Sequence, residues 1–221
     1  MNIIYQDKFI VVCEKPVGVV SEYTKTGNNM PDLVKKATNS YKIDVLHRLD
    51  KDVGGLMVFS KKHEASADLS RQIAKHEMTK EYLAVVENSP VEPKGTFTDL
   101  LFRDRTKGKS FVVSGMRKGV KEAVLDYETV DTRIINSKTY SLVKIKLHTG
   151  RTHQIRVQFS SRKMSLMGDG KYGSKEKNTK IALWSYHLNF LHPNTKKPVD
   201  FKLLPPDVFP WNKFNLADID L

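Results

Sequence analysis

Residues 140–148, YSLVKIKLH, set the fold class that this sequence predicts. Val143, Ile145 and Leu147 alternate with polar residues, and a period of two is typical of a β-strand with one buried face. Because β-branched and aromatic residues fill several other short runs, the chain is expected to be rich in strands. The runs interpreted as strands are residues 9–13, 55–60, 81–87, 123–130 and 182–193, and residues 95–130 are interpreted as a set of β-hairpins.

Short helices are expected between these strands. Residues 31–38 begin with a proline, which suits the first helical position, and residues 62–75 carry apolar residues at four-residue spacing. Residues 152–160 suit a third helix, with Thr152 as its candidate N-cap. Since helices and strands do not alternate regularly, we predict an α+β fold with a mixed, mainly antiparallel β-sheet and flanking helices. No linker divides the chain, so a single domain over residues 1–221 is expected.

The composition is that of a globular protein without membrane spans or disulfides. The 221 residues are 39% hydrophobic, and the early apolar run at residues 9–13 is far too short to cross a bilayer. The N-terminus, MNIIYQDK, lacks the order of a signal peptide. Cys13 is the only cysteine, which excludes an internal disulfide framework. We expect a cytoplasmic protein with no membrane partner, and we expect a monomer.

The charge balance points to polyanionic partners. Lys and Arg number 37 against 25 Asp and Glu, a formal net charge of +12, and this surplus favours nucleic acid or an anionic membrane surface. A basic surface kept for solubility is the alternative interpretation. No acidic residue lies between Asp131 and Asp169, and this acid-free segment is expected to bind phosphates. Its cations are Arg133, Lys138, Lys144, Lys146, Arg151, Arg156, Arg162 and Lys163.

Residues 47–55, HRLDKDVGG, place acids among cations and end at two glycines. An Asp beside Arg and Lys is most often a solvated ion pair, and on the residue pattern alone this structural interpretation is the stronger one. Gly54 and Gly55, however, permit a close approach of the backbone to a ligand, or a positive φ. A carboxylate paired with Arg stays ionised, so Asp50 is suited to act as a nucleophile or weak base.

Residues 149–156, TGRTHQIR, form a second candidate site. A glycine turn that opens a helix offers free N–H groups and the positive end of the helix dipole, which suit a phosphate. Arg151 and Arg156 add guanidinium groups. An ordinary basic helix start is the alternative, and the position inside the acid-free segment favours the anion site.

Metal and cofactor sites are not expected. His148 and His153 lie five residues apart, as do His187 and His192, and this spacing suits neither one helix face nor one strand face. The sequence contains neither a Walker-type loop nor a dinucleotide-binding fingerprint.

Several motifs together resemble the RluA-type pseudouridine synthases. They occur in the family's order and rough spacing, and the resemblance covers nearly the whole chain. It implies an RNA substrate, ribosomal or transfer RNA, in which uracil is detached from C1′ and rejoined through C5 without a cofactor or metal. The motifs are FIVVCEKPVGVV, HRLDKDVGGLMVFSK, KEYLAVV, TGRTHQIRVQF and LHPNTKKPVDFKLLPPDVF.

The resemblance also implies residue roles. Asp50, in HRLD, would be the catalytic aspartate, and Arg156, in HQIR, would pair with it and keep it ionised. Tyr82 would stack on the target uracil, and Arg48 would help to fill the place of the flipped uridine. Ile155 would form an apolar wall of the uracil pocket. The further substrate-binding candidates are Lys80, which is structural or phosphate-facing, and His47, Arg151 and His153.

Two features depart from the family pattern. Val53-Gly54-Gly55 stands where relatives often have Thr-Ser-Gly, so any hydrogen bond from the threonine hydroxyl is missing or replaced. The catalytic motifs begin almost at Met1, so no N-terminal S4 domain is expected and the RNA would be gripped by the catalytic domain itself.

Two rival functions are the alternatives to this interpretation. A non-catalytic RNA-binding or ribosome assembly protein explains the charge equally well, but it does not explain why Asp50, Tyr82 and Arg156 occur together. A glycosidase needs two cooperating carboxylates, and Asp52 is the only acidic neighbour of Asp50 in the sequence.

Overall fold

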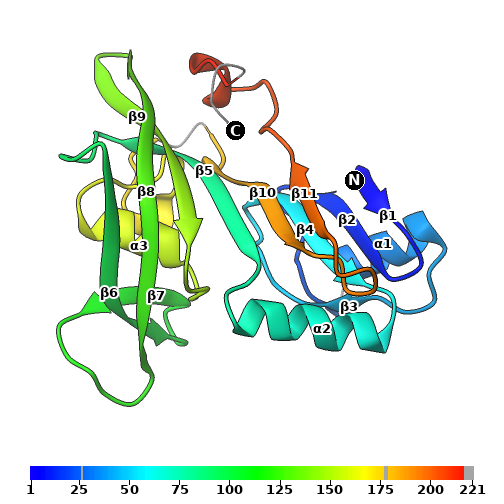
Figure 1. Ribbon diagram of the computed structural model, residues 1–221. Coiled ribbons are helices and arrows are strands. Elements are labelled where there is room, and N and C mark those ends of the chain that lie inside the picture. Colours follow the sequence, from blue (N-terminus) through cyan, green and yellow to red (C-terminus); the bar gives the residue numbers. More distant parts are fainter. Residues whose placement is uncertain (26, 177–178, 217–221) are drawn as a thin grey trace. The chain divides into compact units, whose positions relative to one another are not determined.

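The computed structural model describes residues 1–25, 27–176 and 179–216 (Figure 1). The described chain divides into two compact units. Unit 1 comprises Met1–Lys80 and Trp184–Pro205, and unit 2 comprises Glu81–Leu183 and the described residues from Pro206. The expectation of a single domain over residues 1–221 stays a prediction.

Unit 1 is a mixed β-sheet with helices. Its central strands run in the order β1-β2-β4-β10, with β3 paired to β4 and β11 paired to β10. The β4–β10 pair is parallel, and the other pairs are antiparallel. The strands are β1 (Ile3–Gln6), β2 (Ile10–Lys15), β3 (Asp44–Val45), β4 (Gly54–Ser60), β10 (Leu183–Leu191) and β11 (Pro198–Lys202), and the helices are α1 (Met30–Thr38) and α2 (His63–Ala74).

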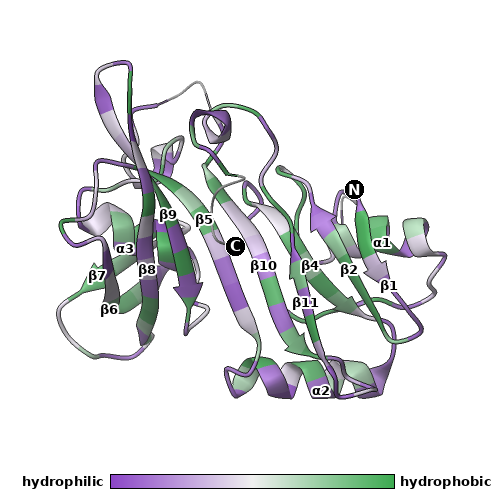
Figure 2. Ribbon diagram, turned by 45° about the horizontal axis from the view of Figure 1, so that its top comes forward, coloured by the Kyte–Doolittle hydropathy of each residue, from purple (hydrophilic) through white to green (hydrophobic). Residues whose placement is uncertain are grey.

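The core of unit 1 lies between α2 and the strands. Every residue of β4 is buried, as its continuous apolar run predicts. From α2, Ala65 and Leu69 pack against Leu56 and Val58 of β4. Hydrophobic and hydrophilic residues alternate along β10 (Figure 2), so that strand presents one apolar face to the same core.

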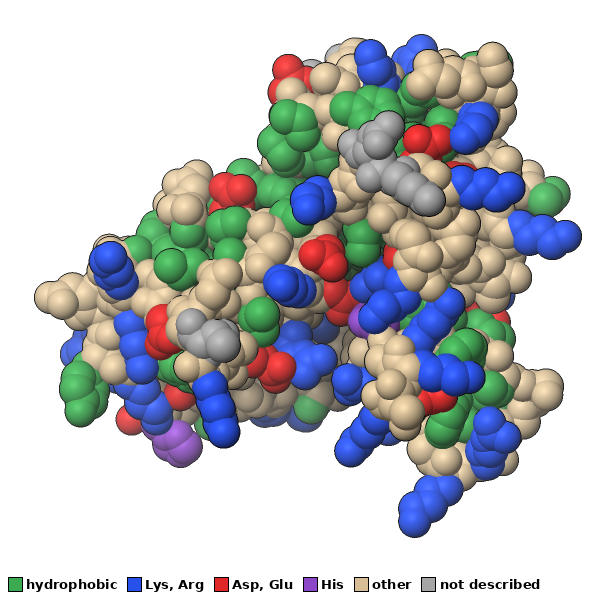
Figure 3. All heavy atoms as spheres, turned by 180° about the vertical axis from the view of Figure 1, so that it is seen from behind, with side chains coloured by type: hydrophobic (Ala, Val, Ile, Leu, Met, Phe, Trp, Pro, Cys, Tyr) green, Lys and Arg blue, Asp and Glu red, His purple; other side chains and the backbone are tan. Residues whose placement is uncertain are grey.

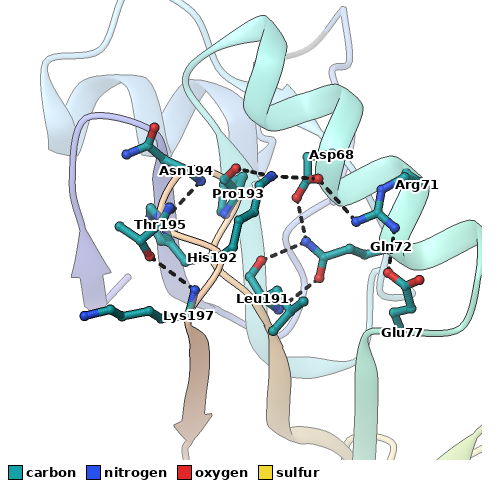
Figure 4. A network of polar contacts seen from close by, with 11 residues as sticks. Asp68, Arg71, Gln72, Glu77, Leu191, His192, Pro193, Asn194, Thr195 and Lys197 are labelled. Atoms are coloured by element: carbon teal, nitrogen blue, oxygen red, sulfur yellow. Dashed lines mark hydrogen bonds and ion pairs between the residues drawn. The ribbon is translucent and has the colours of Figure 1, made fainter.

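A network of hydrogen bonds connects α2 to the turn between β10 and β11 (Figure 4). The buried Gln72 amide donates to the Leu191 carbonyl at 2.7 Å and accepts from the Leu191 N–H at 2.9 Å. His192 Nδ1 accepts the N–H groups of Asn194 and Thr195, and its Nε2 lies 2.9 Å from Asp7. These contacts make His192 a structural residue of the turn.

Unit 2 is an antiparallel sheet with one α-helix packed on it. Its strands run in the order β5-β9-β8-β6-β7. The hydrophobic cluster under the helix contains Leu101, Ala123, Val157 and Tyr172. The elements are β5 (Thr79–Glu87), β6 (Lys94–Asp104), β7 (Lys109–Val113), β8 (Val120–Ile135), β9 (Lys138–Leu147), α3 (Gln154–Ser161) and the short 3-10 helices η1 (Gly170–Tyr172) and η2 (Trp211–Lys213).

The start of α3 differs from the prediction. Thr152 is not the N-cap; that position belongs to His153, which has a left-handed backbone with φ of 55° and makes no capping hydrogen bond through its side chain. The left-handed residue turns the chain between Thr152 and the helix. Residues 154–159 are all buried, so the helix does not expose a basic face.

The fold class is confirmed, since the strands are mixed but mainly antiparallel and helices flank them. The predicted helices at residues 31–38 and 62–75 correspond to α1 and α2, and the predicted strands correspond to β2, β4, β5, β8, β9 and β10. The short strands β1, β3 and β11 were not predicted. Among the described helices, none has the length and apolar character to span a membrane.

Candidate active site

The HRLD motif lies in a tight turn of unit 1, directly before β4. The Val53 N–H donates to the Asp50 carbonyl at 3.0 Å, which closes a four-residue turn. Before the turn, Ser21 Oγ donates to the Leu49 carbonyl at 2.7 Å and lies 3.1 Å from the Leu49 N–H. The backbone on the amino-terminal side of Asp50 is therefore held by a buried hydroxyl.

The other side of Asp50 is held by Lys15, which is fully buried. Its Nζ donates to the carbonyls of Pro16 and Lys51, both at 3.0 Å, and of Val53 at 2.6 Å. Burial lowers the pKa of Lys15 to about 8, although the nearby carboxylates of Asp52 and Asp50 act in the opposite direction. The hydrogen bonds to Lys51 and Val53 thus stabilise the turn that carries Asp50, and the third fixes the Pro16 carbonyl.

The two residues after the turn must be glycines because β10 packs closely against them. A Cβ on Gly54 would lie 2.3 Å from the Trp184 ring, and a Cβ on Gly55 would lie 2.2 Å from the Ser185 carbonyl oxygen. Gly55 also has a φ of 115°. The close approach predicted for this pair is therefore to β10. Val53 is 2% exposed, so its methyl groups are buried.

His47 is fixed by the sheet. Its Nε2 accepts the Val58 N–H at 3.1 Å, which extends the hydrogen bonding of β4 beyond its short partner β3. Burial, and secondly the charge of Lys80, lower the pKa of His47 to about 3, so the ring is neutral with its proton on Nδ1. Burial also lowers the pKa of Lys80. Arg48 is exposed and pairs with Glu22 at 2.8 Å.

In unit 2 the HQIR motif presents a buried cation. The Arg156 guanidinium donates two parallel hydrogen bonds to the Asp169 carboxylate, from Nε to Oδ2 at 2.6 Å and from Nη2 to Oδ1 at 2.8 Å. The two side chains are 6% and 0% exposed. Because a bidentate pair of this kind fixes the plane of the guanidinium, Arg156 has a defined orientation.

Tyr172 connects Arg156 to the residue that precedes α3. The Arg156 guanidinium lies over the Tyr172 ring at 5.1 Å, and the Tyr172 hydroxyl lies 2.9 Å from His153 Nδ1. The same hydroxyl accepts the Ser110 N–H at 2.8 Å. Burial raises the pKa of Tyr172, so the phenol stays protonated. The structure therefore brings His153 and Arg156 together on one aromatic side chain.

The other unit 2 candidates lie on α3, on β5 and in the loop before α3. Ile155 is 4% exposed on α3, and Tyr82, 6% exposed, pairs with Ile145 across β5 and β9. Arg151 donates through Nε to the Glu122 carbonyl at 2.7 Å, so one edge of its guanidinium is already used.

Sequence reasoning missed three residues of these two regions. Lys15 lies in the quoted segment FIVVCEKPVGVV but was not given a role, and Asp169 and Tyr172 lie in GDGKYG at residues 168–173. Asp169 carried a usable signal, since it is the first acid after the acid-free segment that contains Arg156. No signal in the sequence placed Lys15 beside residues 51–53.

The charge of the acid-free segment is partly neutralised within unit 2, and the expected binding of phosphates by this segment stays a prediction. Acids of unit 2 pair with five of its eight cations, and one of these pairs, Arg133–Asp131, lies within β8 itself. Figure 3 shows Lys and Arg side chains scattered over one face, with acidic side chains between some of them. The pairs are Arg133–Asp131, Lys138–Glu176, Lys144–Glu128, Arg156–Asp169 and Arg162–Asp99.

No group of three or more His, Cys, Asp or Glu side chains among the described residues is arranged to hold a metal ion.

Residues 9–161 match the family described as RNA pseudouridylate synthase. The chain belongs to this family. The matched residues include the HRLD turn and all of α3. The RluA-type resemblance is confirmed, and the protein is an RNA pseudouridine synthase, an isomerase.

Individual proteins agree with this assignment. An uncharacterized RNA pseudouridine synthase of Aquifex aeolicus is 32% identical over 95% of this chain and 71% of its own length. The ribosomal large subunit pseudouridine synthase D of Zymomonas mobilis is 32% identical over 94% of this chain and 70% of its own length. The solved structure of human RNA pseudouridylate synthase domain containing 1 has the same fold, with a TM-score of 0.79, 21% identity, and coverage of 94% of this chain and 84% of that one.

Proposed function

We propose that this pseudouridine synthase modifies uridines of ribosomal RNA of the large subunit, and that Asp50 is its catalytic residue. The main support for this proposal is that the backbone around Asp50 is held in place. Ser21 binds it on one side and Lys15 on the other, and the residue between them is half-buried. A group that must meet a reacting atom needs such a fixed mount. The relative named for the large ribosomal subunit supports the choice of RNA.

The remaining roles follow the same proposal. A uridine within folded RNA must leave its stack before it reacts, at a cost of a few kcal/mol. Stacking of the uracil on Tyr82 offsets part of this cost, with Ile155 as an apolar wall, while Arg48 helps to fill the vacated place. Lys80 is a candidate for a structural role or a phosphate contact, and the burial that lowers its pKa favours the structural role.

The pairing of Arg156 with Asp50 stays a prediction. Its support is that Arg156 is buried and oriented, since Asp169 and Tyr172 hold the guanidinium in one plane. Arg156→Lys keeps the charge but loses the planar fork. We expect that variant to lose turnover more than RNA affinity, and equal losses of both would indicate a plain phosphate contact.

The substrate is tested by mapping pseudouridines in total RNA from cells with and without the gene. The proposal expects a pseudouridine in large-subunit ribosomal RNA to disappear and to return when the purified protein acts on that RNA in vitro. Loss of a pseudouridine from transfer RNA alone would move the assignment to transfer RNA. Unchanged maps together with RNA binding would favour the non-catalytic assembly protein. A cytoplasmic location belongs to the same proposal.

A further inference from the structure

The side chain of Arg48 has one ion-pair partner within the described part of the chain, and that partner is Glu22. Arg48 Nη1 donates to Glu22 Oε2 at 2.8 Å. The two side chains are 49% and 51% exposed, and Arg48 follows Glu22 by 26 residues. Glu22 lies in the segment between β2 and α1, and Arg48 stands two residues before Asp50. The pair therefore connects this segment to the HRLD turn.

The backbone on both sides of Arg48 is fixed. His47 Nε2 accepts a backbone N–H of β4 at 3.1 Å. On the other side, the Leu49 N–H and carbonyl both lie within hydrogen-bond distance of Ser21 Oγ, at 3.1 and 2.7 Å. Because Ser21 is next to Glu22, the segment that fixes this backbone also supplies the carboxylate. A movement of the Arg48 guanidinium is therefore a rotation of its own exposed side chain away from Glu22.

The Arg48–Glu22 pair is weak enough to be exchanged. One hydrogen bond joins the two side chains, although a guanidinium carries several N–H donors. Arg71, on α2, differs because it binds two carboxylates, Asp68 at 3.3 Å and Glu77 at 2.7 Å. An exposed pair contributes little to stability, since two long side chains must be ordered and water screens their charges. The pair is therefore not needed for folding, and its position beside Asp50 indicates a role in the reaction.

The ion pair and the proposed role of Arg48 exclude each other. In that role the guanidinium takes the place of the flipped uridine and stacks on the neighbouring bases. Phosphates border every base stack, so a carboxylate that stayed 2.8 Å from the guanidinium would be carried among phosphates. Since like charges repel, the guanidinium must leave Glu22 when it enters the stack.

We propose that Glu22 is a positioning residue that holds the Arg48 side chain outside the RNA stack until the target uridine flips. This inference rests on the proposed function, because it assumes that Arg48 fills the vacated place. Glu22 then competes with the RNA for one guanidinium. The competition disfavours the flipped complex, in which the pair is broken, and leaves unchanged any complex in which the uridine stays stacked.

The test measures uridine flipping by fluorescence. A stem–loop RNA carries the target uridine found by pseudouridine mapping, with 2-aminopurine beside it, whose fluorescence changes when its neighbour leaves the stack. Glu22→Gln removes the charge and keeps the shape of the side chain. The matched control is Glu77→Gln, which removes the charge of an exposed pair with Arg71 in the same unit. A fully paired duplex of the same length measures binding without flipping, and thermal melting checks the fold.

Glu22→Gln is expected to bind the stem–loop RNA about 2-fold to 5-fold more tightly and to flip a larger fraction of the uridine, because an exposed ion pair corresponds to a factor of about this size. Its affinity for the duplex and its melting temperature should remain those of the wild type. Glu77→Gln should change none of these quantities. In an Arg48→Gln background, Glu22→Gln should give no gain, because no guanidinium is left to release.

A gain that persists in the Arg48→Gln background, or that extends equally to the duplex, would overturn the proposal, since loss of any negative charge near RNA would then explain it. Unchanged or weaker binding of the stem–loop by Glu22→Gln would also overturn it, and weaker binding would mean that Glu22 guides Arg48 into the stack. If the wild type gives no fluorescence change, the proposed flipping itself fails together with this inference. If the wild type flips the uridine and Glu22→Gln does not alter the signal, this inference alone fails.

Discussion

The two motif regions hold their key residues in different ways. At the HRLD turn it is the backbone on both sides of Asp50 that is fixed, by Ser21 and Lys15. At the start of α3 the side chain itself is fixed, because Arg156 is locked to Asp169 and lies against Tyr172. Substitution of Asp50 should therefore affect chemistry with little effect on stability, whereas substitution of Arg156 should affect stability first.

Arg156→Ala is expected to produce the largest loss of stability. It would leave the fully buried Asp169 carboxylate without its partner, at a cost of about 3–5 kcal/mol in the free energy of unfolding. Arg162→Ala is the matched control, because its pair with Asp99 is partly exposed, and its loss should be about 1–2 kcal/mol. Urea unfolding measures both. Equal losses would show that burial does not make the Arg156–Asp169 pair contribute more to the free energy of unfolding than a partly exposed pair.

Lys15→Met is expected to loosen the HRLD turn. Three backbone carbonyls would lose their donor, at a cost of about 2–3 kcal/mol at pH 7, and turnover should fall more than RNA affinity because the mount of Asp50 becomes mobile. Lys51→Met, at an exposed position, is the control and should change neither quantity. Wild-type turnover in the Lys15→Met variant would show that the hydrogen bonds of Lys15 are not needed to position Asp50.

The buried ammonium of Lys15 also predicts a pH dependence. Its pKa is lowered from 10.5 to about 8, so between these values the folded protein has released a proton that the unfolded chain retains. The unfolded state then binds more protons, and the contribution of Lys15 to the free energy of unfolding rises with pH through this window. Relative to Lys15→Met, the wild type should gain about 3 kcal/mol from pH 8 to 10.5. A pH-independent difference in urea unfolding would refute the lowered pKa.

Tyr172→Phe should have the smallest effect. The ring that lies under Arg156 is retained, while the hydroxyl contacts to Ser110 and His153 are lost. We expect a loss of about 1–2 kcal/mol in thermal or urea unfolding, because the buried Ser110 N–H is left without its acceptor. A loss as large as that of Arg156→Ala would mean that the hydroxyl, and not the ion pair, organises the start of α3.

Much of the fold could be predicted because its signals are local. The alternation in residues 140–148 and the apolar run of β4 identify strands directly, and the proline of α1 marks a helix start. The misses are also physical. β1, β3 and β11 have five residues or fewer and depend on neighbouring strands. The left-handed His153, not Thr152, precedes α3 because tertiary contacts set that turn.

Of the candidate site, only residues that lie within the sequence motifs could be predicted. HRLD and HQIR identify Asp50 and Arg156 from a few adjacent residues, but Lys15 lies 36 residues before the carbonyl of Lys51 that it binds. The pairing of the cations could not be predicted for the same reason: Glu176 pairs with Lys138 from a distant part of the chain. Charge along the sequence therefore locates the cations but not the acids that fold next to them.

The most direct test of this account compares Asp50→Asn with Asp52→Asn, a matched change at an exposed acid two residues away in the same turn. RNA affinity, thermal melting and pseudouridine formation are measured for both at saturating RNA. The account predicts wild-type melting and affinity for both variants, no pseudouridine from Asp50→Asn, and near-normal turnover from Asp52→Asn. Measurable pseudouridine formation by Asp50→Asn would contradict it.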